Sequence, residues 1–249
     1  MESDKNMKRY GLIGHPLKHS QSRFYFNERF EYEGLDCLYQ HFDIKTVEEV
    51  FDIIAHYPDL CGFNVTIPYK ESIIPLLDEI DPVAKEVGAV NVVKITNGIL
   101  KGYNTDVVGF EALLERAIKG RDTSRALILG TGGAAKAVQY VLRQKGIPYS
   151  TVSRSAERGD YTYDTLTDEV LRQHSLIINT TPLGMFPQTD NFPDLHYQGL
   201  TQQHTLIDLI YNPKETSFML LGHTWCGKVY NGMQMFEEQA KKTWEIFQS

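Results

Sequence analysis

A short glycine-rich segment carries the clearest chemical signal in the sequence. The run Gly130-Thr131-Gly132-Gly133-Ala134-Ala135 directly follows the apolar stretch Ala126-Leu127-Ile128-Leu129 and opens a segment with helical spacing. Its G-x-G-x-x-G/A form is typical of a dinucleotide site, because glycines permit a tight turn and the close approach of a pyrophosphate to the backbone. The N–H groups at the start of the next helix also favour phosphate. An ordinary strand-to-helix turn is the alternative interpretation.

The residues after the next expected strand indicate which dinucleotide is favoured. Ser153-Arg154-Ser155 follows Val152, and Arg158 lies just beyond. An NAD site often has Asp or Glu at this point to hold the ribose 2′-hydroxyl, whereas a guanidinium pairs with a 2′-phosphate. The sequence therefore favours NADP. Two arginines in an exposed loop are the alternative interpretation.

Lys70 and Asp106 are candidates for acid–base chemistry. The segment Gly62 to Lys70 places a lysine just beyond an expected strand, where open α/β sheets form ligand crevices. Asp106 ends the segment Gly102-Tyr103-Asn104-Thr105-Asp106, in the first turn of an expected helix. Together the two residues suit a carbonyl–alcohol couple. Taken singly, each has a plainer interpretation: Lys70 as a solvated lysine, and Asp106 as an acid at a helix start, where the helix dipole favours negative charge.

The elements that must position these residues follow an alternating α/β pattern. In the first part of the chain we expect strands at 10–13, 38–42 and 62–66, helices at 22–32 and 47–54, and a hairpin turn at 96–98. A helix over 104–119 is expected to connect two lobes, because its apolar residues share one stripe and Gly120 follows. Such a pattern predicts a mostly parallel sheet.

A second alternating series begins at Arg125. Strands are expected at 126–129, 149–152, 176–178 and 206–209, with a helix from the glycine turn to Gly146. This repetition predicts a Rossmann-type lobe. A final helix from about Gly232 has Met233, Phe236, Ala240 and Phe247 on one face, which suits packing against the first lobe.

Composition and charge exclude several classes of protein. With 249 residues, 42% of them apolar and 23% charged, the chain is typical of a folded soluble protein. The net charge of −7 disfavours nucleic acid and anionic membranes as partners, and no stretch approaches the ~18 apolar residues of a spanning helix. The cysteines Cys37, Cys61 and Cys226 lack CxxC spacing, which predicts free thiols and a cytoplasmic protein.

Taken together, the motifs and their order resemble the shikimate dehydrogenase family. The segments that carry the resemblance are His19-Ser20-Gln21-Ser22, Gly62 to Lys70, Ala89-Val90-Asn91, Gly102 to Asp106, the turn at Gly130, Ile178 to Met185 and Gly232 to Gln239. The resemblance implies a two-lobed α/β fold. A substrate-binding domain would span residues 1–106, completed by the helix 232–249, and an NADP-binding Rossmann domain would span 107–231. It also implies NADP-dependent reversible reduction of 3-dehydroshikimate to shikimate, a step of aromatic amino-acid biosynthesis.

The resemblance further implies roles for individual residues around the substrate. Beside the catalytic Lys70 and Asp106, it assigns the substrate carboxylate and ring hydroxyls to Ser20, Ser22, Thr66, Asn91, Tyr211 and Gln239. Each of these has a plainer interpretation. A serine can cap the first helix, Asn91 can belong to a strand-end turn, Tyr211 can be a loop aromatic, and Gln239 can lie on the surface.

The residues that the resemblance assigns to the cofactor are spread over the second half of the chain. They are Gly130, Thr131, Gly132, Gly133, Ala134, Ser153, Arg154, Ser155, Arg158, Thr180, Met185, Gly232 and Met235. Methionines are also common core fillers. The chain departs from the usual family pattern in having Ser153-Arg154-Ser155 in place of Asn-Arg-Thr and Thr131 in place of Ala. The retained arginine keeps NADP favoured.

Other functions remain as alternatives. One is a quinate/shikimate dehydrogenase that uses NAD or NADP, and another is a non-catalytic nucleotide-sensing paralogue that would have no need of both Lys70 and Asp106. A metal is not expected, because His15 and His19 flank Pro16 in a loop without an HExxH pattern. We expect a small-molecule substrate and a monomer or homodimer.

Overall fold

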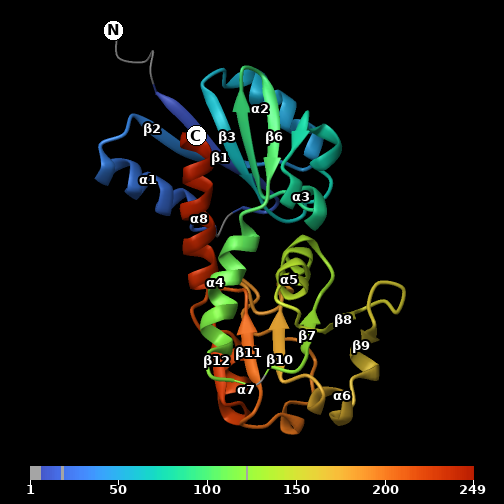
Figure 1. Ribbon diagram of the computed structural model, residues 1–249. Coiled ribbons are helices and arrows are strands. Elements are labelled where there is room, and N and C mark those ends of the chain that lie inside the picture. Colours follow the sequence, from blue (N-terminus) through green and yellow to red (C-terminus); the bar gives the residue numbers. More distant parts are fainter. Residues whose placement is uncertain (1–6, 18–19, 122) are drawn as a thin grey trace. The chain divides into compact units, whose positions relative to one another are not determined.

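The computed structural model describes residues 7–17, 20–121 and 123–249, which form two compact units (Figure 1). Unit 1 contains Met1–Thr105 and Ala240–Ser249, and unit 2 contains Asp106–Gln239. Each unit has its own sheet and its own apolar core. The expectation of an α/β chain in two parts is confirmed.

The sheet of unit 1 combines parallel strands with an antiparallel hairpin. Its strands are β1 (Lys8–Gly14), β2 (Cys37–Asp43), β3 (Leu60–Val65), β4 (Glu79–Ile80), β5 (Val92–Thr96) and β6 (Ile99–Tyr103), in the order β2-β1-β3-β5-β6-β4. Strand β1 pairs parallel with β2 and β3, whereas β5 pairs antiparallel with β3 and β6. At the predicted hairpin, Asn97 (φ 52°) and Gly98 (φ 80°) adopt the positive φ that such a turn requires.

Helices and the C-terminal residues complete the core of unit 1. The helices are α1 (Ser22–Glu33), α2 (Val50–His56) and α3 (Pro82–Val87), and the end of α8 (Met233–Gln248) joins them (Figure 1). The ring of Tyr10 on β1 stacks on Phe247 of α8, with 4.7 Å between centroids, and lies edge-on to Trp244 at 5.6 Å. These large aromatic contacts hold the last turns of the chain on the first strand.

Unit 2 is a parallel sheet covered by helices. Its strands are β7 (Ala126–Leu129), β8 (Tyr149–Ser153), β9 (Tyr161–Thr162), β10 (Leu176–Asn179), β11 (Thr205–Asp208) and β12 (Lys228–Tyr230), in the order β12-β11-β10-β7-β8-β9. The helices are α4 (Asp106–Ile118), α5 (Gly133–Gln144), α6 (Asp168–Arg172), α7 (Ser217–Trp225) and the first part of α8. The strands β7 and β10 are fully buried, as expected where helices cover both faces of a parallel sheet.

The boundary between the units differs from the expected one at α8. We expected all of 232–249 to accompany residues 1–106, but the division falls between Gln239 and Ala240. The first part of α8 packs on α4, where a Cβ added to Gly109 would lie 2.4 Å from the Met235 carbonyl oxygen. A glycine at position 109 therefore permits close contact between these two helices. The helix α4, expected to connect two lobes, lies entirely in unit 2.

Candidate functional site

In unit 1, backbone hydrogen bonds bring three predicted residues to one edge of the sheet. The Val65 N–H donates to the Asn91 carbonyl at 2.8 Å, and the Val90 N–H donates to the Lys70 carbonyl, also at 2.8 Å. Thr66 follows β3 directly, so Thr66, Lys70 and Asn91 lie on chain segments that touch. This is the carboxyl end of β3, where open α/β sheets bind ligands.

The serines predicted to hold a carboxylate lie near the same edge. Ser20 Oγ accepts the N–H of Ser22, the first residue of α1, at 3.3 Å, and the two hydroxyls are also 3.3 Å apart. The two hydroxyls thus lie together at the start of α1, whose N-cap is Gln21. Just before it, a Cβ on Gly14 would lie 2.4 Å from Thr66 Cγ2, so glycine permits the close approach of β1 to the Thr66 segment.

A buried polar network orients the Asn91 side chain. Asn91 Oδ1 accepts the Thr105 N–H at 2.7 Å, and Asn91 Nδ2 donates to Thr105 Oγ1 at 3.0 Å. Thr105 Oγ1 lies 3.1 Å from Thr243 Oγ1, which accepts from Asn64 Nδ2 at 3.3 Å. Asn64 Oδ1 accepts the Tyr39 hydroxyl at 2.8 Å. We call Tyr39, Asn64, Asn91, Thr105 and Thr243 the neutral network. Sequence analysis identified Asn91 alone among its members as a site residue.

Asp106 is the first residue of α4 and is 5% exposed. It follows Thr105 of the neutral network directly in the chain, so the network fixes the backbone on which Asp106 begins its helix. Lys70 belongs to unit 1 and Asp106 to unit 2. Their joint role as an acid–base pair therefore stays a prediction.

In unit 2, the glycine-rich turn requires glycine at position 130 and has open space beside position 132. Gly130 has φ 111°, and a Cβ there would lie 2.7 Å from Thr180 Oγ1, so position 130 needs glycine on both counts. Thr180 Oγ1 in turn donates to the Leu129 carbonyl at 2.7 Å. At Gly132 an added Cβ would meet nothing within 4 Å among the described residues. The predicted residue Thr131 belongs to this turn, and Gly133 and Ala134 are the first two residues of α5.

The start of α5 is open to an anion. Within the described chain, no side chain caps this helix at Gly132, and Gly132 is exposed. Its first N–H groups and the positive end of the helix dipole therefore face free space beside the turn. The residues present fit a bound dinucleotide phosphate, because backbone donors and room for the phosphate coincide.

The end of β8 presents two guanidinium groups. Arg154 and Arg158 are exposed, and neither forms an ion pair with an acid in the part of the chain that the structure describes. Ser153 Oγ accepts the Ser155 N–H at 3.3 Å, which shapes the backbone between them. A carboxylate neighbour would have neutralised the arginines, so the charge of both remains available to an anion.

The remaining predicted residues of unit 2 gather after β10, after β11 and at the start of α8. The ring of Tyr211 packs on Phe236 of α8, with centroids 4.5 Å apart. The Gly232 N–H donates to the Ile210 carbonyl at 3.0 Å, and a Cβ at Gly232 would lie 2.0 Å from the Leu209 carbonyl oxygen. The backbone of Gly232 thus lies directly against the segment that carries Tyr211.

The predicted residues Met185, Met235 and Gln239 lie in different surroundings. Met185, in the loop after β10, is 44% exposed, whereas Met235 is 8% exposed against α4. Gln239 Nε2 donates to the Phe236 carbonyl at 3.0 Å, and its Cβ lies 3.1 Å from the position a Gly109 Cβ would take. Met235 is therefore buried, while Met185 presents its side chain at the surface.

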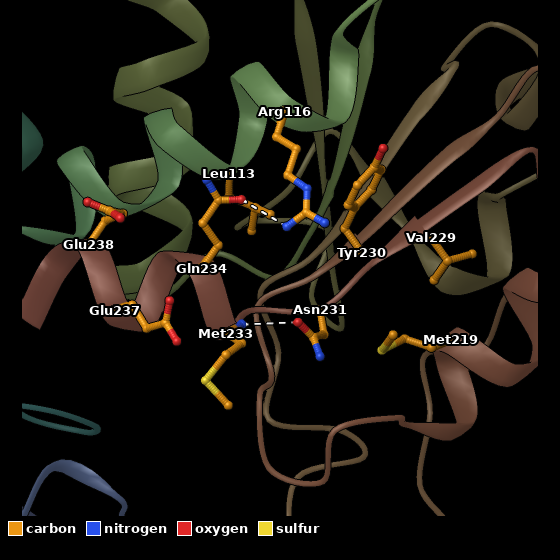
Figure 2. Close-up of a pocket in the computed structure, with 10 residues that line it drawn as sticks. All are labelled: Leu113, Arg116, Met219, Val229, Tyr230, Asn231, Met233, Gln234, Glu237 and Glu238. Atoms are coloured by element: carbon orange, nitrogen blue, oxygen red, sulfur yellow. Dashed lines mark hydrogen bonds between the residues drawn. The ribbon is translucent and has the colours of Figure 1, made fainter. Parts of the chain in front are cut away.

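A separate pocket of about 550 Å³ lies between α4, β12 and α8 (Figure 2). Arg116 there lies over the ring of Tyr230, 5.7 Å from its centroid, and donates to Gln234 Oε1 at 3.4 Å. Asn231 Oδ1 accepts the Met233 N–H at 3.2 Å. None of the lining residues is a predicted site residue, and Arg116 is exposed.

The described residues give no support for a metal site or a membrane-spanning helix. They contain no group of three or more His, Cys, Asp or Glu side chains that could hold a metal ion, and His19 of the motif lies outside them. None of their helices is both long and apolar enough to cross a membrane. Cys37, Cys61 and Cys226 are free thiols.

Comparison with known proteins decides the family. The shikimate dehydrogenase substrate-binding domain matches residues 12–93. A shikimate dehydrogenase (NADP(+)) of Syntrophomonas wolfei is 39% identical over 267 residues, covering 99% of this chain and 91% of its own. The chain belongs to the shikimate dehydrogenase family. The family resemblance predicted from the motifs is confirmed.

Other members of the shikimate dehydrogenase family agree in sequence and fold. The shikimate dehydrogenase (NADP(+)) of Methanosphaera stadtmanae is 35% identical and covers 95% of this chain and 90% of its own. The crystal structure of the Thermus thermophilus enzyme with NADP(H) and shikimate has a TM-score of 0.84 at 28% identity, and covers 97% of this chain and 93% of that one. The predicted two-part fold with a Rossmann-type unit is therefore that of a shikimate dehydrogenase.

Proposed function

We propose that this protein is an NADP-dependent shikimate dehydrogenase, which reversibly reduces 3-dehydroshikimate to shikimate. The observation that carries the proposal is the match over 99% of the chain to a relative of that activity. The open glycine turn at Gly132 supports NADP as the cofactor, and so does the exposed Arg154, which has no ion-pair partner among the described residues. The segments of Thr66, Lys70 and Asn91, which touch at one sheet edge, support a polar substrate site.

In this proposal the substrate is held by hydroxyls and amides. The adjacent hydroxyls of Ser20 and Ser22 hydrogen-bond the carboxylate, together with Tyr211. The groups that surround the ring hydroxyls are Thr66, Asn91, Asp106 and Gln239. Asn91 Oδ1 accepts the N–H and the hydroxyl of Thr105, and these bonds fix the orientation of the Asn91 amide.

Lys70 moves the proton in the proposed reaction. Reduced NADP supplies the hydride that adds to the ketone carbon. The Lys70 ammonium donates a proton to the oxygen that becomes negative, and its charge stabilises that oxygen as the electrons arrive. Asp106 orients the ammonium and shares hydrogen bonds with a neighbouring hydroxyl. The reverse reaction returns the proton to Lys70.

The cofactor residues divide by the part of the dinucleotide they meet. The turn Gly130 to Ala134 cradles the pyrophosphate, and the segment Ser153 to Arg158 holds the adenosine 2′-phosphate. Thr180, Met185, Gly232 and Met235 surround the nicotinamide side. The free thiols are consistent with a reducing compartment, so we propose a cytoplasmic enzyme, acting as a monomer or homodimer.

The test follows NADPH absorbance with purified protein and 3-dehydroshikimate, and then repeats the assay with NADH and with shikimate and quinate in the oxidising direction. We expect turnover with NADPH, weaker use of NADH, and preference for shikimate over quinate. Binding of NADPH without turnover of any of these substrates would select the nucleotide-sensing alternative instead. Equal turnover of quinate would select the quinate/shikimate alternative.

A further inference from the structure

The carboxylate of Asp208 lies at the centre of hydrogen bonds between the loops that follow β10 and β11. Asp208 ends β11 and is 0% exposed. Its Oδ1 accepts from Asn179 Nδ2 at 3.0 Å and from the Ile210 N–H at 3.1 Å. Its Oδ2 accepts the Thr216 hydroxyl at 2.6 Å. A buried carboxylate with three donors is well satisfied, and the donors come from two segments of the chain.

The first of these segments is the loop after β10. Asn179 ends β10, and its Oδ1 accepts both the N–H and the hydroxyl of Thr181, at 3.0 and 2.7 Å. Thr181 Oγ1 then accepts the Leu183 N–H at 3.3 Å. The Asn179 amide therefore links the Asp208 carboxylate to the turn that carries Thr180 and leads to Met185.

The second segment runs from Asp208 to the start of α7. The Ile210 N–H, held by Asp208, lies next to Tyr211, and the Ile210 carbonyl accepts the Gly232 N–H. Thr216 caps α7 through the Met219 N–H at 3.3 Å. Asp208 thus fixes both ends of the segment that holds Tyr211 and supports Gly232.

Direct contacts between the two loops reinforce this arrangement. The Phe186 N–H donates to the Asn212 carbonyl at 3.3 Å. A Cβ at Gly184 would lie 3.3 Å from the Cβ of Thr216, so the tip of the first loop packs on the residue that Asp208 binds. The two loops are held as one body.

We propose that Asp208 is a positioning residue, which through Asn179 and Thr216 locks the loop of Thr180 to Met185 and the Tyr211 segment into one rigid support for the cofactor. This inference rests on the proposed function for the identity of the ligand. It adds to that function a residue that touches neither substrate nor cofactor. If Asp208 had a structural role only, its replacement would change the free energy of unfolding alone.

The first experiment measures amide hydrogen exchange, which needs no ligand. Asp208→Asn keeps the shape of the side chain but presents an NH₂ group to a donor, either to Asn179 and Ile210 or to the Thr216 hydroxyl. We expect faster exchange in residues 180–187 and 209–213 and unchanged exchange in 151–155. Unchanged exchange in both loops of the folded variant would overturn the proposal.

The second experiment measures the Kd of NADP+ by calorimetry. We expect Asp208→Asn to raise it about tenfold, equivalent to 1.4 kcal/mol. Thr216→Val, which removes one donor, should also raise the Kd of NADP+. Thr216→Ser, which keeps the hydroxyl, should have the wild-type Kd. A Kd within twofold of wild type in both Asp208→Asn and Thr216→Val would overturn the proposal.

His204→Gln is the matched control. His204 is 3% exposed and hydrogen-bonded, and it precedes the opposite end of the same strand β11. Its replacement should lower stability without changing NADP+ affinity or exchange in the two loops, and an equal change in the control would reduce Asp208 to a structural role. If the wild type binds NADP+ but reduces no substrate, the proposed function fails while the Asp208 measurements still decide the inference. If it binds no NADP+, hydrogen exchange alone decides it.

Discussion

Each unit of the molecule contains a buried polar network beside its predicted ligand residues, and the two networks differ in charge. In unit 1, the amides and hydroxyls of Asn64, Asn91, Thr105 and Thr243 bond to one another. In unit 2, the carboxylate of Asp208 takes all three donors. A neutral network orients side chains at a low desolvation cost once its bonds are made, whereas a buried carboxylate keeps part of its cost. The comparison indicates that the network of unit 2 holds its loops at a greater cost in stability than the neutral network of unit 1.

The networks also differ in how far along the chain their members lie. Asn64 and Thr243 are 179 residues apart, whereas Asn179 and Asp208 are 29 apart. The neutral network therefore closes only when the end of α8 folds onto unit 1. The network around Asp208 assembles from neighbouring strands of one sheet.

The largest expected effect is on the chemical step, which depends on Lys70 rather than on either network. The Lys70 carbonyl accepts the N–H of Val90, the residue before Asn91, and Lys70→Ala keeps this backbone bond to the segment that carries the neutral network. We expect kcat to fall by about 10²- to 10⁴-fold, as for loss of a general acid, with a small change in the KM for shikimate. Steady-state kinetics measures this, and Lys85→Ala on the exposed side of α3 is the control. Turnover comparable to wild type would remove Lys70 from the chemistry.

The second effect concerns pH and tests the difference in charge directly. Burial raises the pKa of the Asp208 carboxyl to about 6, although the bonds from Thr216, Ile210 and Asn179 oppose the rise. Because this value exceeds the ordinary one of 3.8, the folded state binds more protons between the two values. The stability that Asp208 contributes is therefore full below about pH 4 and falls as the pH rises towards 6, by at most about 3 kcal/mol.

Urea unfolding of wild type and Asp208→Asn at several pH values measures this change. The stability of wild type minus that of Asp208→Asn should fall between about pH 4 and 7. The corresponding difference for Thr243→Val should stay constant, because the neutral network holds no carboxylate. Parallel curves for wild type and Asp208→Asn would contradict the assignment of a raised pKa to Asp208.

Much of the fold was predictable because its signals are local. The run from Ala126 through the glycine turn contains strand, turn and helix in continuous sequence, and the structure has β7, the positive φ of Gly130 and α5 there. The family was predictable for a related reason, since its motifs are contiguous segments. The short strand β12 was not predicted, because three residues at a sheet edge show no periodicity.

The networks were not predictable, because no local pattern marks their members. Asp208 was expected only as part of a strand, and nothing in the run Leu206 to Leu209 indicates that Asn179 and Thr216 face it. The contact of Thr243 with Asn64 depends on the folding of both ends of the chain into unit 1. Polar residues that are satisfied by distant partners become visible only in the structure.

A third prediction extends the comparison to charge at the cofactor site. Arg154 has no acidic partner among the described residues, so its guanidinium is available to a 2′-phosphate. Arg154→Ala should raise the Kd of NADP+ by about 30-fold, or about 2 kcal/mol, and leave that of NAD+ nearly unchanged. Calorimetric titration with both dinucleotides measures this, with Arg172→Ala on α6 as the control. An equal loss for NAD+ would place Arg154 away from the 2′-phosphate.

The smallest expected effect tests the neutral network itself. Thr243→Val keeps the volume of the side chain but removes a hydroxyl that is 0% exposed, so Asn64 Nδ2 and Thr105 Oγ1 each lose one of their hydrogen-bond partners. We expect a loss of about 1 kcal/mol in the free energy of unfolding and a several-fold rise in the KM for shikimate, because Thr105 orients Asn91. The Kd of NADP+ should not change, and Thr243→Ser should restore both quantities. A lower affinity for NADP+ in Thr243→Val, with an unchanged KM for shikimate, would contradict the assignment of the neutral network to the substrate. A hydroxyl of unit 1 would then affect the ligand assigned to unit 2.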